Sequence, residues 1–149
     1  MNTTQMKAHI ANGGIDARLS YIYGEAAVAS QKARYSAAID EFAAIYGADR
    51  EISLYSVAGR SELSGNHTDH NHGCVVAASI DLDIIAVASA REDSVIAIKS
   101  EGFPEDVVDF SKYNAPIEAK FGSSESIIAG MVQGFVKDGY AVGGFDAYT

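Results

Sequence analysis

Apolar side chains recur at helical spacing in the first third of the chain. Between residues 27 and 46 the intervals are four, three and four, which places the side chains on one face of a helix: Tyr35, Ile39, Phe42 and Tyr46. Gly47 follows, where a helix commonly ends. A shorter helix is predicted from an N-cap at Asp16, because residues 19, 22 and 23 are apolar. The polar dozen residues before Gly13 receive no predicted element.

The apolar period changes to two after residue 50, which is typical of β-strands. Residues 51–59 alternate in this way and form the first predicted strand. Three more follow at 74–81, 83–90 and 94–101, and turn-like residues separate the last two. This spacing predicts an antiparallel meander. The last residues, 141–149, predict a glycine-hinged strand.

A second well-marked helix is predicted from Ser124 onward. Its apolar positions repeat at i, i+3, i+4 and i+7: Ile128, Met131, Val132 and Phe135. Ser123 or Ser124 is the expected N-cap, and Gly139 lies just past the expected end. Gly130 and Gly134 would each cost this helix about 1 kcal/mol relative to alanine. We therefore expect them to permit close packing against a neighbouring strand or helix.

Together these elements predict one α+β domain over residues 1–149, with a mostly antiparallel sheet and helices at both ends. Between residues 102 and 121 the pattern weakens to at most one short strand at 106–110, because Pro104 excludes a helix through it. The length of 149 residues suits a single domain. A content of 48% hydrophobic and 21% charged residues is close to that of globular proteins, which argues against disorder.

The charge distribution excludes some classes of partner. A formal net charge of −9, spread along the chain, would repel a phosphate backbone, so we expect no nucleic acid partner. No apolar run approaches the ~20 residues of a membrane span, and the N-terminus lacks a secretory pattern. We therefore expect a cytoplasmic protein without membrane contacts. The single cysteine, Cys74, opens an apolar run and is predicted to be buried.

Residues 59–73, GRSELSGNHTDHNHG, gather polar side chains between glycines directly after the first predicted strand. Imidazole and carboxylate groups at 67, 69, 70 and 72 suit zinc or iron. Because adjacent loop residues are expected to point in different directions, no metal site is predicted. Short side chains at 68, 69 and 71 could instead satisfy backbone groups of a tight turn. The same polar groups could also recognise the hydroxyls of a sugar.

This segment also carries a specific family motif. Residues 59–71 resemble the galactokinase signature G-R-x-N-L-I-G-E-H-T-D-Y-N, which belongs to the sugar branch of the GHMP small-molecule kinases. The resemblance extends to the helix, Tyr–Gly turn and strand at 41–60 and to the paired strands at 73–89. It therefore implies the N-terminal part of the GHMP kinase fold over most of the chain.

The resemblance implies a galactokinase, which transfers the γ-phosphate of ATP, with Mg²⁺, to the anomeric hydroxyl of galactose. Carried over by position, Asp69 and His67 would hydrogen-bond the sugar. Arg60 would lie beside the reacting hydroxyl, where a fixed positive charge offsets the charge that develops on the phosphoryl group. Asn66 stands where the signature has glutamate. An amide can still hydrogen-bond a sugar but brings no charge, so the preferred sugar could differ.

Other positions also depart from the signature. Glu62 replaces asparagine, and Ser64 replaces isoleucine. His70 replaces tyrosine, and Ala58 replaces the proline before the Gly–Arg pair. His70 and His72 match no sugar contact of the motif, and we interpret them as surface or turn residues.

The family's phosphate loop, P-x-G-x-G-L-S-S-S-A, is missing from this sequence, as is the aspartate that accepts the sugar proton. The resemblance places both beyond Thr149. We therefore expect an N-terminal portion of a galactokinase that is inactive alone and binds the remainder of the enzyme. Its final strand would lack partners and leave an exposed edge that favours self-association. Two alternatives stay open: a non-catalytic galactokinase-like sugar sensor, and a metal-binding module that uses His67, His70 and His72.

Overall fold

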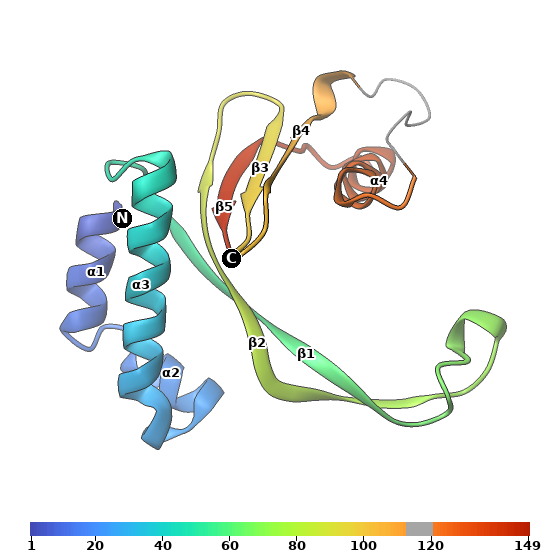
Figure 1. Ribbon diagram of the computed structural model, residues 1–149, viewed down its shortest axis with the longest axis horizontal. Helices are drawn as coiled ribbons and strands as arrows, with labels where there is room; N and C mark the ends of the chain where they lie inside the picture. The colour runs from blue at the N-terminus through green and yellow to red at the C-terminus, as the bar shows by residue number, and fades with distance from the viewer. Residues whose placement is uncertain (113–120) are drawn as a thin grey trace.

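The computed structural model describes residues 1–112 and 121–149. In these residues the chain forms, in order, α1 (Thr3–Ala11), α2 (Asp16–Tyr23), α3 (Val28–Tyr46), β1 (Ser53–Ser64), β2 (Val76–Ala90), β3 (Val95–Lys99), β4 (Glu105–Asp109), α4 (Ser124–Lys137) and β5 (Phe145–Tyr148). Figure 1 shows the first three helices gathered on one flank, a long β1–β2 hairpin that extends away from them, and α4 beside β4 on the opposite flank. This arrangement confirms the predicted α+β class.

The strand order of the sheet is β1-β2-β5-β3-β4. Three of the four neighbouring pairs are antiparallel, and only β3 and β5 run parallel. The predicted meander is therefore wrong, because β5 inserts between β2 and β3. The two strands predicted at 74–81 and 83–90 are one strand, β2, since β1 pairs with it from Val76 to Ala88.

The last strand is not an edge of the sheet. β5 pairs with β2 on one side and with β3 on the other, so the prediction of an unpartnered final strand is wrong. The edges are β1 and β4. Both neighbours of β5 come from this chain, and pairing with them satisfies its backbone groups without a second molecule.

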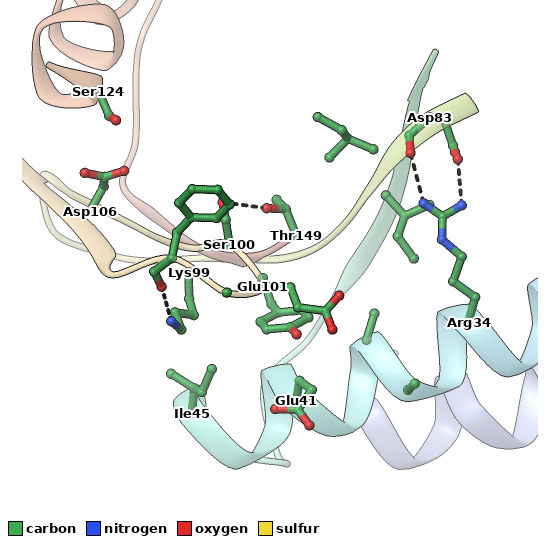
Figure 2. Close-up of a pocket in the computed structure, with 17 residues that line it drawn as sticks. Arg34, Glu41, Ile45, Asp83, Lys99, Ser100, Glu101, Asp106, Ser124 and Thr149 are labelled. Atoms are coloured by element: carbon green, nitrogen blue, oxygen red, sulfur yellow. Dashed lines mark hydrogen bonds and ion pairs between the residues drawn. The ribbon is translucent and has the colours of Figure 1, made fainter. Parts of the chain in front are cut away.

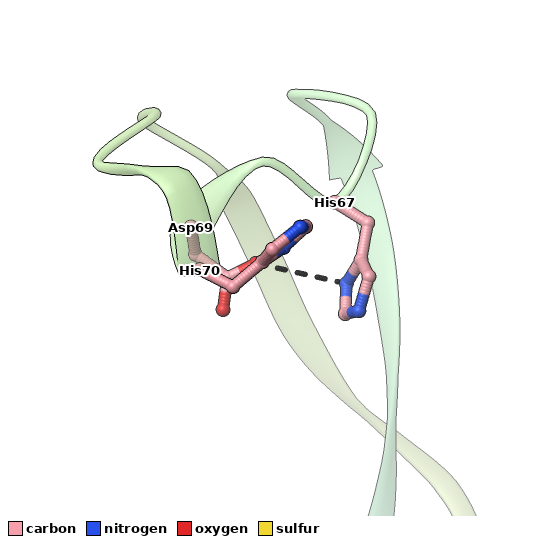
Figure 3. A group of neighbouring side chains, drawn as sticks. All are labelled: His67, Asp69 and His70. Atoms are coloured by element: carbon pink, nitrogen blue, oxygen red, sulfur yellow. Dashed lines mark ion pairs between the residues drawn. The ribbon is translucent and has the colours of Figure 1, made fainter.

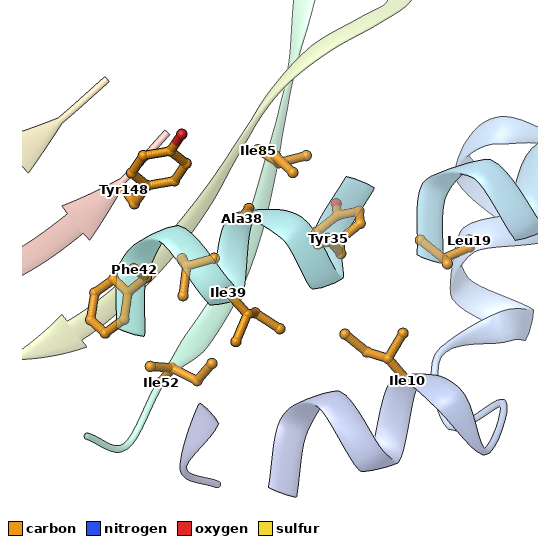
Figure 4. Packing of buried hydrophobic residues seen from close by; sticks show 10 residues of the cluster. Ile10, Leu19, Tyr35, Ala38, Ile39, Phe42, Ile52, Ile85 and Tyr148 are labelled. Atoms are coloured by element: carbon orange, nitrogen blue, oxygen red, sulfur yellow. The ribbon is translucent and has the colours of Figure 1, made fainter. Parts of the chain in front are cut away.

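The main core forms where α3 crosses the sheet. Its predicted apolar face is confirmed: Tyr35, Ile39 and Phe42 are buried, and the helix ends at Gly47, whose φ of 99° favours glycine. The neighbours of this face come from α1, α2, the residue before β1, and the strands β2 and β5: Ile10, Leu19, Ile52, Ile85, Val87 and Tyr148 (Figure 4). This core fixes the base of the β1–β2 hairpin.

The N-terminal helix α1 was not predicted. Its start is marked by a capping box, in which the Asn2 side chain accepts from the Gln5 backbone and the Gln5 side chain accepts from the Asn2 backbone. The spacing of three residues between Asn2 and Gln5 is the sequence pattern that could have predicted this helix start. The next helix, α2, begins one residue before expectation, because Ile15 occupies the N-cap position and Asp16 is already helical.

The predicted limits of α4 are confirmed, with Ser123 as N-cap and Gly139 just beyond the end at a φ of 86°. The predicted role of its glycines is wrong. A Cβ added at Gly130 or Gly134 would meet nothing within 4 Å, so neither glycine permits a close approach. Part of the apolar stripe of α4 also faces outward, including Met131 and Phe135. Within the described parts of the chain, no helix is both long and apolar enough to cross a membrane.

Candidate functional site

The polar signature begins on a strand rather than on a loop. β1 does not end at Gly59, as predicted, but continues to Ser64 and stays paired with β2. The register shifts between Ala58 and Arg60, which indicates a bulge at Gly59. Arg60 and Glu62 therefore lie on the same face of a regular strand, two residues apart. A strand holds a side chain in a more defined direction than a loop does.

The loop itself spans residues 65–75 and is shaped by close backbone approaches. Gly65 has a φ of 120°, and a Cβ there would come within 2.6 Å of the Cys74 carbonyl oxygen. Asn66 and His67 follow with φ of 54° and 55°, a conformation that asparagine and histidine tolerate better than most residues. The Thr68 hydroxyl donates to the Gly65 carbonyl at 2.8 Å. These contacts turn the chain back toward β2.

A short 3₁₀ turn, η2 (Asp69–Asn71), completes the loop. The Thr68 carbonyl accepts from the backbone N–H groups of Asn71 and Gly73, both at 2.9 Å. His72 has a φ of 63° and ends the turn. The tight-turn interpretation of the segment therefore applies to Thr68, while the side chain of Asp69 remains 56% exposed for other contacts.

A pocket of about 270 Å³ lies at the junction of the strand ends and this loop. Three of the predicted site residues line it: Arg60 from β1, and His67 and Asp69 from the loop. Asn66 is exposed and is not among the lining residues, so its sugar contact stays a prediction. The structure thus brings a guanidinium, an imidazole and a carboxylate to one concave surface.

Glu62, which departs from the motif, is a further lining residue and was not predicted to belong to the site. Its Oε1 accepts from the backbone N–H of His67 at 2.6 Å, and its Oε2 lies 3.6 Å from Nδ1 of the same histidine. Only 25% of the Glu62 side chain is exposed, so this carboxylate holds the His67 turn in place. The two-residue spacing from Arg60 would have revealed Glu62, had the strand been extended past Gly59.

Charge of both signs meets in this pocket. Oδ1 of Asp69 also lies 3.6 Å from Nδ1 of His67, and Figure 3 draws this contact as a dashed line. Carboxylates accept hydrogen bonds only, a guanidinium donates only, and an imidazole can do either. Such a set can satisfy both the donor and the acceptor of several neighbouring hydroxyl groups. The apolar share of the wall comes from Val75 and Ala77.

His70 also points toward His67 and Asp69 (Figure 3). One ligand atom from each of these three residues lies within 4.8 Å of the others. The expectation that adjacent loop residues would point in different directions is therefore wrong for these three. His72, the other histidine of the predicted metal-binding module, is outside the group. Cys74 is exposed, so its predicted burial is wrong, because the apolar run it opens lies on the projecting hairpin rather than in the core.

A larger pocket, of about 940 Å³, lies between α3, β2 and the β3–β4 turn (Figure 2). None of the predicted sugar contacts lines it. Its charged walls are Arg34, Glu41, Asp83, Lys99, Glu101 and Asp106. Four of these six are acidic, and the Arg34 guanidinium is already bound to Asp83 at 2.6 Å. This wall suits an anionic ligand poorly.

Asp83 is the centre of a polar network that joins the hairpin to the helices. Its carboxylate accepts from Ser56 at 2.6 Å, from Tyr23 at 2.5 Å and from Arg34. Burial alone would raise the pKa of Asp83, but these three donors lower it below its ordinary value. Burial and the bond to Asp83 raise the pKa of Tyr23. The network fixes the direction in which the hairpin leaves the core.

Comparison with known proteins relates the hairpin and its loop to one family. Residues 40–90 match the family model described as the galactokinase galactose-binding signature. Galactokinase from Lactococcus lactis subsp. lactis is 38% identical over 76 residues, which are 50% of this chain and 19% of that protein. Human galactokinase is 37% identical over 62 residues, 40% of this chain and 16% of that protein.

A solved structure agrees with these sequence matches. The crystal structure of Lactococcus lactis galactokinase complexed with galactose is similar to this chain, with a TM-score of 0.63 and 28% sequence identity. The superposed part covers 77% of this chain and 30% of that one. The chain thus spans less than a third of the length of these relatives. In the sequence of its signature region and in its fold, this chain is similar to galactokinases.

Proposed function

We propose that this chain forms the galactose-binding part of an ATP-dependent galactokinase, which phosphorylates the anomeric hydroxyl of the sugar. The observation that carries the proposal is the meeting of Arg60, His67 and Asp69 in one pocket of about 270 Å³. All three lie within residues 40–90, the segment that matches the galactose-binding signature. A similar galactokinase structure was solved in complex with galactose, which supports the same ligand class here.

The side chains in the pocket have distinct roles in this proposal. The Asp69 carboxylate is 56% exposed and accepts hydrogen bonds from sugar hydroxyls. Glu62 holds the backbone N–H of His67, and the imidazole ring of His67 adds a second directional partner. The Arg60 guanidinium stabilises negative charge that develops where the phosphoryl group is transferred.

Neither of these two pockets suits a triphosphate. Arg60 is the one fixed cation that lines the sugar pocket, and the larger pocket has mainly acidic charged walls. ATP, with Mg²⁺, supplies the transferred phosphoryl group. We propose that the groups that bind it, and the base that accepts the sugar proton, come from other parts of a longer galactokinase. The chain alone is then expected to bind sugar without turnover.

Galactose binding to the chain tests the first half of the proposal. Titration of ¹⁵N-labelled chain with galactose, followed by NMR, should shift resonances of residues 60–75 and leave those of α1 unchanged. Asp69→Asn should weaken binding, because an amide replaces the acceptor-only carboxylate. Asp81→Asn is the matched control, since Asp81 is an exposed carboxylate on the same hairpin outside the pocket. Equal affinity in both variants would contradict the assignment of Asp69.

Phosphorylation of galactose by the intact protein tests the second half. We expect Arg60→Ala and Asp69→Ala each to reduce activity strongly, with the loss for Arg60→Ala mainly in kcat, since its charge acts on the transition state. An intact protein that binds galactose but does not phosphorylate it would favour the sugar-sensor alternative. Full activity in both variants would refute the residue roles.

A further inference from the structure

The group formed by His67, Asp69 and His70 contains a residue that the galactokinase signature does not provide. His70 stands where the signature has tyrosine, and it lies outside the lining of the sugar pocket. His67 and Asp69 both line that pocket. The group is therefore built from two sugar-pocket residues and one residue that departs from the signature. We propose that these three side chains form a site for a divalent transition-metal ion of the zinc type, and that this ion competes with the sugar.

The geometry is close to what such an ion requires. Ligand atoms at about 2.0–2.1 Å from a tetrahedral zinc ion are about 3.3 Å apart. Here one ligand atom from each residue lies within 4.8 Å of the others, so closure needs shifts of about 1.5 Å at most. The side chains of His67 and Asp69 are 71% and 56% exposed, so they can turn without disturbing a packed neighbour.

The surroundings also favour an imidazole-binding cation. Glu62 lies 3.6 Å from Nδ1 of His67 and adds negative charge beside the group. The side-chain amide of Asn71 lies 3.0 Å from Nε2 of His70. A metal ion at Nδ1 of His70 requires the ring proton on Nε2, and the Asn71 side chain accepts that proton's hydrogen bond once its amide is rotated so that the oxygen faces the ring. Two imidazoles and one carboxylate select zinc-type ions over Mg²⁺, which prefers oxygen ligands and keeps its waters.

Occupation of this site would remove two groups from sugar recognition. A bound cation takes the lone pairs of Asp69 and of one His67 nitrogen, which are the acceptors assigned to sugar hydroxyls. It would also place positive charge in the pocket that Arg60 lines. The competition rests on the proposed function, whereas metal binding itself does not.

Calorimetric titration of the chain with zinc chloride alone tests the site. We expect one zinc ion per chain, with no heat from magnesium chloride. His70→Tyr, which restores the residue of the signature, should weaken zinc binding by at least about 10-fold, because even the loss of an outer partner costs that much. His72→Asn is the matched control, since His72 is exposed, lies outside the group and has a φ of 63° that asparagine tolerates. Zinc affinity that is unchanged by His70→Tyr, or reduced equally by His72→Asn, would overturn the site, as would the absence of binding.

Galactose titration in the presence of saturating zinc tests the competition. We expect a weaker apparent galactose affinity in the unsubstituted chain and no effect of zinc in His70→Tyr. Galactose binding that zinc leaves unchanged would overturn the competition. If galactose does not bind even without zinc, the proposed function fails, while the zinc titrations still decide the metal site.

Discussion

Replacing Asp146 by asparagine should strongly destabilise the fold. Asp146 lies in β5, and 1% of its side chain is exposed. Its Oδ1 lies 2.7 Å from the Arg91 guanidinium, and its Oδ2 lies 2.9 Å from that of Arg50. Arg91 follows β2, and Arg50 lies between α3 and β1, so one buried carboxylate connects the last strand to two distant segments.

The magnitude follows from burial. Removing one partner of a buried ion pair costs about 3–5 kcal/mol, because the remaining charge is left without compensation. Arg50 and Arg91 retain 32% and 29% side-chain exposure, so water can still reach both guanidiniums. We therefore expect the lower end, about 3 kcal/mol, for Asp146→Asn. Against a typical stability of about 5–15 kcal/mol, this is a large fraction.

Urea unfolding followed by circular dichroism measures this loss. With a slope of about 2 kcal/mol per molar, the midpoint should fall by about 1.5 M. Asp93→Asn is the matched control: Asp93 binds the same Arg91 at the same 2.7 Å, but its side chain is 52% exposed. We expect little change in the midpoint for this variant, because water screens exposed ion pairs. Equal midpoints for the two variants would refute the argument that burial sets the strength.

Three further predictions concern the helix, the loop and acid stability. Gly134→Ala in α4 should stabilise the chain by about 0.5–1 kcal/mol in urea unfolding, because the added methyl group meets nothing within 4 Å; a destabilised variant would contradict the open geometry. Gly73→Ala should abolish galactose binding, because the new Cβ would lie 2.7 Å from the Thr68 carbonyl oxygen and would displace the loop. The unfolding midpoint should stay nearly unchanged, because the loop is remote from the core. Retained galactose affinity would contradict this prediction. Since the pKa of Asp83 is lowered in the folded chain, its stabilising effect is present above the unfolded value of about 3.9 and is lost as the pH falls through the folded value. Unfolding free energies measured between pH 6 and pH 2 should decline less in Asp83→Asn, and an identical decline would refute this contribution.

Local patterns in the sequence were sufficient for the helices with strong signals. Gly47 and Ser123 mark the limits of α3 and α4, because caps and left-handed glycines depend only on neighbouring backbone groups. The signature motif likewise indicated that Arg60, His67 and Asp69 belong together, and the structure places all three on one pocket.

Only the tertiary structure decided how the strands combine. The insertion of β5 between β2 and β3 depends on pairings between segments more than 40 residues apart, such as Ile98 with Ala147, which no local pattern encodes. Three other features also depend on which segments pack beside one another. They are the continuity of β2, the open surroundings of Gly134 and the contact of Glu62 with His67. The sequence determined the chemical groups and their local elements, whereas the distances between distant segments, and therefore the pocket and the His67–Asp69–His70 group, were set by packing.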